Sequence, residues 1–334
     1  MSPDDVVLRA TDVVKDFPVR RQGFGPRQAV HAVDRVSLEV RRGETLGVVG
    51  ESGCGKSTLG RCLARLLDVS SGTIELNGRD ITSLSRRQLR PVRRDVQMVF
   101  QDPYASLNPR RRVGEIVAEP LLIQSYGDRA KVRARVGELL ELVGLSAVHA
   151  DRYPHEFSGG QRQRVGIARA LAMSPSLIVA DEPVSALDVS IQAQVLNLFA
   201  DLQDELGLTY VFIAHDLGVV NHVSDRIAVM YLGSIVELSS ADDLYDAPAH
   251  PYTEALLSAA PEIDDGLQEI GTRERIVLTG DVPNAITKPP GCAFHTRCPY
   301  AQDRCKVDAP ALVEIAPGRQ VSCHFPLIAP LVKQ

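Results

Sequence analysis

The stretch Gly50-Glu51-Ser52-Gly53-Cys54-Gly55-Lys56-Ser57 decides the interpretation of this chain, because it fits the pattern G-x-x-x-x-G-K-[ST]. An apolar run over 45–49 predicts a buried strand before it, and residues 58–67 predict a helix with one apolar face after it. In that setting the glycines turn backbone N–H groups toward phosphate oxygens, and the helix N-terminus adds a positive dipole end. Lys56 would then reach the β- and γ-phosphates of a nucleotide, and the Ser57 hydroxyl would bind Mg²⁺. A Gly/Ser turn that binds no nucleotide is the weaker alternative.

The composition is that of an ordinary globular protein. The chain has 334 residues, of which 44% are hydrophobic and 24% charged, and no apolar run approaches the roughly 18 residues of a membrane span. Its start, Met1-Ser2-Pro3-Asp4-Asp5, lacks the basic and apolar regions of a signal peptide, so we expect a cytoplasmic protein. The net charge of −5 argues against a dedicated nucleic-acid binder, and we interpret the arginine clusters in 86–94 and 110–112 as solvated surface.

The pattern of apolar residues changes along the chain. Short alternating runs over 6–49 predict antiparallel strands, and residues 103–157 predict an inserted helical subdomain. From residue 160 onward helices alternate with apolar strands, as at 177–180 and 210–213, which predicts a parallel sheet flanked by helices. A Pro-rich, weakly periodic stretch begins near residue 247. We therefore predict an α/β protein with one domain over 1–246 and a second over 247–334.

Several polar residues follow apolar strands and could complete a nucleotide site. Asp181 and Glu182 end the strand over 177–180. Asp181 would orient Mg²⁺, and Glu182 would polarise or deprotonate the attacking water. Gln101 could complete the Mg²⁺ shell through its amide oxygen, and His215 could contact the γ-phosphate. Taken alone, each could instead be a solvated or structural residue.

Two further motifs show a resemblance to a known family. Phe157-Ser158-Gly159-Gly160-Gln161 resembles the signature motif of ATP-binding cassette (ABC) proteins, and Ser185-Ala186-Leu187-Asp188 resembles the loop after their second carboxylate. The order of all the motifs also matches, and the resemblance covers roughly residues 6–240. It implies an ABC-type P-loop ATPase fold with an antiparallel β subdomain, a RecA-like parallel-sheet core and an inserted helical subdomain.

The resemblance also implies a set of ATP-binding residues. Phe17 occupies the place of the adenine-stacking aromatic, although a core role is the alternative. In the family, the signature of one subunit closes on the ATP of the other, so each ATP lies between two cassettes and Glu182, His215, Lys56 and Gln101 are catalytic. The residues implied to contact ATP are Phe17, Gly50, Glu51, Ser52, Gly53, Cys54, Gly55, Lys56, Ser57, Thr58, Gln101, Asp181, Glu182 and His215, with Ser158, Gly159, Gly160, Gln161 and Asp188 acting in trans; Ser57, Gln101 and Asp181 would bind Mg²⁺.

The last part of the chain indicates which group of ABC proteins the chain resembles. His250-Pro251-Tyr252-Thr253, Gly280-Asp281-Val282-Pro283 and the stretch 289–299 resemble the C-terminal extension of dipeptide and oligopeptide importer cassettes, over about 240–326. This implies an ATPase subunit at the cytoplasmic face of the membrane. Its partners would be a second, related cassette, two permease subunits and an extracytoplasmic binding protein, with no nucleic acid. An importer of nickel or another small solute is the alternative, and a soluble ABC ATPase acting on nucleic acid or ribosomes is a more remote one.

Four cysteines gather in this extension. Cys292, Cys298, Cys305 and Cys323 are spaced C-x5-C-x6-C-x17-C, and four thiolates suit a [4Fe–4S] cluster or tetrahedral zinc. The spacing fits neither common ferredoxin runs nor paired zinc knuckles. Because some relatives of this extension carry an iron–sulfur cluster, we favour that over zinc or free thiols, in a structural role. His295 and His324 are possible zinc ligands.

Overall fold

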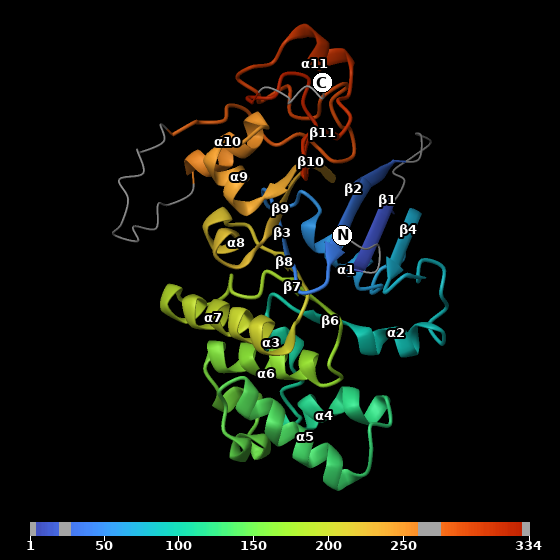
Figure 1. Cartoon of the computed structure of the whole chain (residues 1–334), viewed down its shortest axis with the longest axis vertical. Helices are drawn as coiled ribbons and strands as arrows, with labels where there is room; N and C mark the ends of the chain where they lie inside the picture. The colour runs from blue at the N-terminus through green and yellow to red at the C-terminus, as the bar shows by residue number, and fades with distance from the viewer. Residues whose placement is uncertain (1–4, 20–27, 260–274, 329–334) are drawn as a thin grey trace. The chain divides into compact units, whose positions relative to one another are not determined.

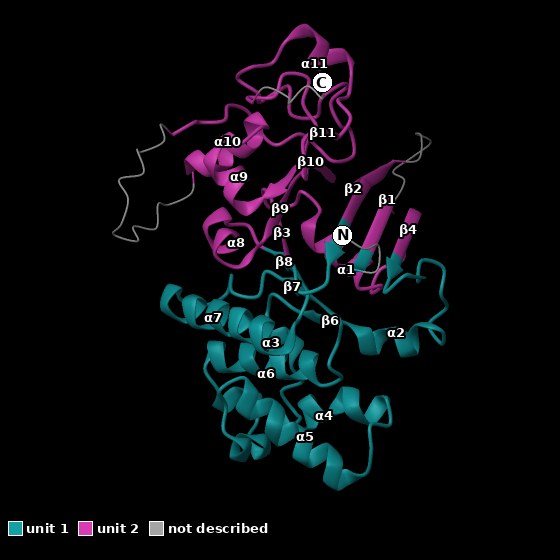
Figure 2. Cartoon of the chain, viewed as in Figure 1, with its two compact units in different colours: residues 1–8, 39–44, 75–213 teal, residues 9–38, 45–74, 214–334 magenta. Residues whose placement is uncertain are grey.

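A computed structural model describes residues 5–19, 28–259 and 275–328 of the chain (Figure 1). These residues fall into two compact units, each described here by itself (Figure 2). Unit 1 comprises residues 1–8, 39–44 and 75–213, and unit 2 comprises residues 9–38, 45–74 and 214–334. Within the described ranges, no helix has the length and apolar character that crossing a membrane requires.

Unit 1 contains three parallel strands. They are β6 (Val96–Val99), β7 (Leu177–Asp181) and β8 (Tyr210–Ile213), with β7 between the other two. Every residue of β7 and β8 is buried, as expected for a parallel sheet that helices cover on both faces. The predicted strands over 177–180 and 210–213 are confirmed to within one residue.

The helices of unit 1 include those expected in the region 103–157. Helix α4 packs against both α5 and α6, and the buried side chains Val136, Leu139 and Leu140 form the apolar face of α5. Helix α7 ends at Leu206 and is followed by Gly207 in the left-handed conformation, with a φ of 63°. The helical elements are α2 (Leu89–Asp95), α3 (Pro103–Ser106), α4 (Val113–Ile123), α5 (Arg129–Leu142), the 3₁₀ segments η2 (Ala147–Asp151) and η3 (Pro154–Glu156), α6 (Gly159–Leu171) and α7 (Val189–Leu206).

Unit 2 contains five strands in the order β11-β12-β10-β9-β3. Strand β3 (Thr45–Val49) pairs in parallel with β9 (Arg226–Tyr231), and β9 forms the predicted hairpin with β10 (Ser234–Ser240). The short strands β11 (Val313–Ala316) and β12 (Arg319–Val321) extend this sheet by antiparallel pairing. Part of the weakly periodic C-terminal stretch therefore continues the sheet that carries the phosphate-binding motif.

The helices of unit 2 are mostly short. Helix α1 begins at Lys56, directly after the glycine-rich loop, and ends at Leu63, so it starts and stops earlier than the predicted 58–67. The helices are α1 (Lys56–Leu63), α8 (Leu217–Val223), α9 (Ala241–Asp246), α10 (Pro251–Ala259) and α11 (Asp303–Val307).

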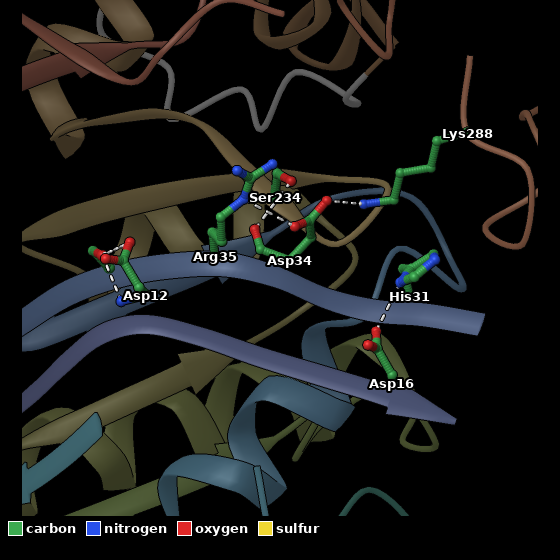
Figure 3. A network of polar contacts seen from close by, with 8 residues as sticks. Asp12, Asp16, His31, Asp34, Arg35, Ser234 and Lys288 are labelled. Carbon is green, nitrogen blue, oxygen red and sulfur yellow. Dashed lines mark hydrogen bonds and ion pairs between the residues drawn. The ribbon is translucent and has the colours of Figure 1, made fainter. Parts of the chain in front are cut away.

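A separate four-stranded sheet has the order β2-β1-β4-β5, and the division between the units runs through three of its strands. Its strands are β1 (Val6–Pro18), β2 (Ala29–Arg41), β4 (Ser71–Leu76) and β5 (Arg79–Asp80). In unit 2 a polar network lies on β1 and β2, where His31 contacts Asp16 at 2.8 Å (Figure 3). The Lys288 ammonium donates to Asp34 of β2 at 2.7 Å. Burial alone would raise the pKa of Asp34, but Lys288 holds it below the usual value.

Buried polar groups connect β10 to the C-terminal segment of unit 2, residues 247–334. Glu237 of β10 is fully buried, and its carboxylate accepts from the backbone N–H groups of Ala249 and His250, both at 2.8 Å. His250 is also buried, and its Nδ1 accepts from the Tyr252 N–H at 3.0 Å. Burial lowers the pKa of His250 to about 3, so this imidazole is neutral in the folded protein at neutral pH.

His250 should make the stability of the protein depend on pH. Its pKa is about 6.5 in the unfolded chain and about 3 in the folded one, so between these values only the unfolded state binds the proton. Below pH 6.5 the free energy of unfolding should therefore decrease as the pH is lowered, by roughly 1.4 kcal/mol per pH unit from this group. Urea unfolding of wild type and His250→Asn at pH 7, 6 and 5 measures this contribution. Glu237 and the other carboxylates are present in both proteins, so the difference between the two pH slopes comes from His250. Identical pH slopes for the two proteins would contradict the prediction.

Candidate active site

The glycine-rich loop between β3 and α1 is closed around the Lys56 side chain. Lys56 is 4% exposed, and its ammonium donates to the backbone oxygens of Gly50 at 2.6 Å and Glu51 at 3.1 Å. Cys54 lies beside it, with Sγ 3.9 Å from the ammonium, and burial raises the pKa of this thiol. A buried cation at the N-terminus of a helix is the arrangement that binds phosphate groups.

Gly55 is the residue of this loop that tolerates a side chain least. Its φ is 108°, and a Cβ there would lie 1.9 Å from the backbone oxygen of Ala32. Gly53 has a φ of 79° but open space around it. Substitutions at these two glycines therefore distinguish the cost of backbone strain from the cost of a steric clash.

Gly55→Ala should destabilise the protein by roughly 2 to 4 kcal/mol, because it adds both strain and a backbone clash. Gly53→Ala adds strain alone and should cost about 1 kcal/mol. The urea midpoints of the two variants and wild type give the comparison. Equal losses in the two variants would show that the contact with Ala32 has no energetic weight.

The loop is also held from the C-terminal segment. The Glu51 N–H donates to the Tyr252 hydroxyl at 2.8 Å. The Arg297 guanidinium donates to both oxygens of the Glu51 carboxylate, at 2.7 and 2.9 Å. All three residues belong to unit 2.

The remaining predicted residues of unit 2 lie near the ends of their elements. Phe17 is at the end of β1, is 37% exposed, and has the Lys15 ammonium 5.1 Å from its ring centre, so it is not a core residue. Ser57 is the second residue of α1 and is partly exposed. His215 is exposed and comes two residues before α8.

Unit 1 brings together two of the predicted catalytic side chains. The Gln101 amide donates to the Glu182 carboxylate at 2.7 Å. Glu182 has a φ of 47°, uncommon for a residue with a side chain, and its backbone N–H donates to the oxygen of Ile213 at 2.9 Å. Asp181 ends β7 at 1% exposure. Strained backbone of this kind is concentrated at functional sites, because the surrounding structure must hold it.

The signature residues also lie in unit 1, at the start of α6. Ser158 caps this helix by accepting from the Gln161 N–H at 3.3 Å, and Gln161 returns a bond to the Ser158 N–H at 3.0 Å. Ser158 and Gln161 are exposed, whereas Gly160 is buried against Ile191. Asp188 is exposed at the start of α7. This first turn is the positive end of the α6 helix dipole, which favours an anion.

The comparisons with known proteins agree with these motifs. Residues 33–185 match the family model described as ABC transporter, and residues 236–305 match the model described as oligopeptide/dipeptide transporter, C-terminal region. The chain is 53% identical over 325 residues to the oligopeptide transport ATP-binding protein AppF of Bacillus subtilis (strain 168), covering 96% of this chain and 98% of that protein. This chain belongs to the ABC transporter family.

Further relatives place this ABC protein in the same group. It is 51% identical to the di/tripeptide transport ATP-binding protein DppF of Pseudomonas aeruginosa (strain UCBPP-PA14), covering 96% of this chain and 98% of that one. Among solved structures, a dimeric post-hydrolysis state of the ATP-binding cassette MJ0796 bound to ADP and Pi has a TM-score of 0.63 and 30% identity, covering 70% of this chain and 98% of that chain. The ABC protein is therefore an ATPase of this family, with an α/β fold built on mixed β pairing.

Sequence reasoning missed several contacts of this ABC protein. Besides the Arg297–Glu51 pair, the Arg162 guanidinium of α6 lies over the ring of Tyr104, 4.0 Å from its centre. Arg169 of the same helix donates to the Ser106 oxygen at 2.7 Å. The short segment after Gln101 is thereby attached to the signature helix. No spacing rule in the sequence signals these pairs, because their members come from separate motifs.

The predicted metal centre of the ABC protein is not supported. The four cysteines do line one small pocket, together with His295 and His324. In the ranges that the structure describes, however, no group of three or more His, Cys, Asp or Glu side chains is placed to hold a metal ion. Burial raises the pKa of the Cys292 and Cys298 thiols, and that of Cys323 to about 11.

Proposed function

We propose that this ATPase energises the import of dipeptides or oligopeptides. The observation that carries the proposal is the match of residues 236–305 to the C-terminal region of oligopeptide and dipeptide transporters. That region lies beyond the part of the chain that matches the general ABC model, so it adds information about the kind of transporter. Curated relatives aligned over nearly the whole chain carry names of the same kind.

In the proposed reaction, Lys56 and the N–H groups of the loop bind the phosphates of ATP. Phe17, exposed at the end of β1, stacks on the adenine. Ser57, Gln101 and Asp181 supply the hydroxyl, amide and carboxylate oxygens that Mg²⁺ prefers, so the donor set suits this ion. When bound, Mg²⁺ neutralises charge on the phosphate oxygens.

Glu182 acts as the base for the attacking water. The water oxygen forms a bond to the γ-phosphorus, the bond from that phosphorus to the β–γ bridging oxygen breaks, and Glu182 accepts the water proton. Gln101 orients the Glu182 carboxylate through their hydrogen bond of 2.7 Å, and His215 contacts the γ-phosphate. ADP and phosphate are the products.

A second cassette completes the site in this proposal. The exposed start of α6, with Ser158 and Gln161, would close on ATP bound to the partner cassette, together with Asp188. The solved relative MJ0796 is described as a dimer, which supports this arrangement. We infer that the partner cassette is a related chain rather than a second copy.

The complex would also include two permease subunits and an extracytoplasmic binding protein, with this chain at the cytoplasmic face of the membrane. Large apolar side chains of unit 1 are available for such a partner. Tyr104 is 63% exposed, and Leu122 and Ile123 at the end of α4 are 59% and 53% exposed. Closure around ATP could then move the permease, because ATP prefers the closed state.

Uptake by cells tests the substrate class. In a strain that lacks this gene, loss of labelled dipeptide uptake, restored by wild type but not by Lys56→Met, would support the proposal. Loss of nickel uptake with normal peptide uptake would assign the chain to a nickel importer. Normal uptake of both solutes, with the protein sedimenting with ribosomes, would instead indicate a soluble role.

We also propose, as a separate matter, that the four-cysteine pocket takes up a [4Fe–4S] cluster, with zinc as the alternative. Its support is the presence of all four thiols on one pocket, although side chains would have to rotate into ligand positions. Protein purified without oxygen should be brown and contain about four iron atoms per chain, and Cys298→Ser should lose the colour. Colourless protein with about one zinc per chain would favour zinc, and metal-free protein would end the proposal.

A further inference from the structure

The phosphate-binding loop of this protein carries a negative charge of its own. Glu51 is the residue after Gly50, and it is 26% exposed at the side chain. Nucleoside triphosphates carry several negative charges, so a carboxylate on the loop that binds them would repel the ligand. Phosphate binding at this loop is therefore favoured by a group that neutralises the Glu51 carboxylate.

Arg297 is placed to do this. Its side chain is 7% exposed and donates to both Glu51 oxygens, at 2.7 and 2.9 Å. A bidentate arginine–carboxylate pair fixes orientation as well as charge. Arg297 is close to Cys298 in the chain and comes from the C-terminal segment, not from the part that matches the general ABC model.

Tyr252 holds the backbone of the same residue. Its hydroxyl accepts from the Glu51 N–H at 2.8 Å, and burial raises the pKa of this tyrosine, which keeps the hydroxyl protonated. The Tyr252 ring packs against Tyr231 and Phe294, with ring centres 4.7 and 5.4 Å away. Phe294 is 1% exposed and precedes Arg297 by three residues, so one buried aromatic cluster supports both contacts to the loop.

We propose that Arg297 and Tyr252 are positioning residues for nucleotide binding. Arg297 neutralises Glu51 and orients its carboxylate, while Tyr252 fixes the Glu51 backbone. The C-terminal segment thus has a role in the ATP site itself, in addition to any role in substrate class. This inference rests on the proposed ATPase function.

The test is the affinity for ATP of the full-length chain, measured by calorimetry in the absence of Mg²⁺. Arg297→Met leaves the Glu51 charge unpaired and should raise the Kd for ATP about tenfold. The double variant Arg297→Met/Glu51→Gln removes both charges and should bind ATP more tightly than Arg297→Met alone. Rescue by the double variant is the result that a merely structural role of Arg297 would not give.

Two further comparisons strengthen the test. Because the effect is electrostatic, Arg297→Met should weaken ATP binding more than ADP binding. Arg304→Met is the control: Arg304 lies in the same segment, but its ion-pair partner is Asp308 at 3.5 Å, and both side chains are exposed. It should leave the Kd for ATP within about threefold of wild type.

The outcomes are distinct. Wild-type affinity in Arg297→Met, no rescue in the double variant, or an equal loss of affinity in Arg304→Met would overturn the inference while leaving the proposed function intact. Failure of wild type to bind ATP would instead remove the proposed function. If Arg297→Met does not fold, Arg297→Lys and Tyr252→Phe replace it, each with an expected rise in Kd of about threefold, because lysine lacks the fork and phenylalanine lacks the acceptor. Wild-type affinity in both would overturn the inference.

Discussion

Glu182→Gln is expected to reduce ATP hydrolysis by roughly two to four orders of magnitude and to leave ATP bound. Glutamine has nearly the shape of glutamate but cannot accept the proton of the attacking water. It can still pair with Gln101, which lies 2.7 Å from the Glu182 carboxylate, so the local structure should persist. Phosphate release by the assembled complex measures turnover, and nucleotide retained after gel filtration measures trapping.

Glu205→Gln is a suitable control for this variant. Glu205 is an exposed carboxylate near the end of α7, so its replacement makes the same chemical change away from the motifs. Its turnover should stay within about twofold of wild type. The assignment of Glu182 as base would be falsified if Glu182→Gln hydrolysed ATP at the wild-type rate.

Lys56→Met should weaken ATP binding by about a hundredfold, which corresponds to about 2.7 kcal/mol. The lysine ammonium is the buried cation of the loop, and methionine keeps most of its length while removing the charge. The expected loss is larger than for Arg297→Met, because Lys56 contacts the phosphates directly in the proposed complex. Calorimetry measures the Kd for ATP. Thermal unfolding of the unliganded protein measures separately whether the substitution changes stability.

Lys131→Met provides the comparison for this variant. Lys131 is an exposed residue on α5, so the same loss of charge occurs far from the loop in sequence. Its affinity for ATP should equal that of wild type. An unchanged Kd in Lys56→Met would show that this lysine does not bind phosphate, and the whole assignment of the loop would need revision.

Local sequence patterns predicted the parts of the fold that local physics determines. The first four residues of β7 and all of β8 are apolar, and such runs are typical of parallel strands buried on both faces. The glycine-rich loop and the capped start of α6 follow from residue types at fixed spacing. The strands β11 and β12 were not predicted, because they have four and three residues and both Val313 and Glu314 are exposed.

The sequence predicts a set of candidate site residues but not the contacts among them. Gln101 and Glu182 were each assigned a role with the nucleotide, and their hydrogen bond to each other emerged only from the structure. The pairing of Arg297 with Glu51 joins residues 246 positions apart, for which no periodicity exists. For the four cysteines, the spacing predicts a metal centre, but no group of three or more described side chains is placed to hold a metal ion.

The separation of 246 positions between Glu51 and Arg297 also has a consequence for biosynthesis. At a translation rate of about 5 to 20 residues per second, the arginine is made roughly 10 to 50 s after its glutamate. During that interval the growing chain holds a loop whose carboxylate has no counter-ion from the later segment. On the role proposed for Arg297, a product that terminates before this residue lacks the group that neutralises Glu51 and should bind ATP more weakly than the complete chain.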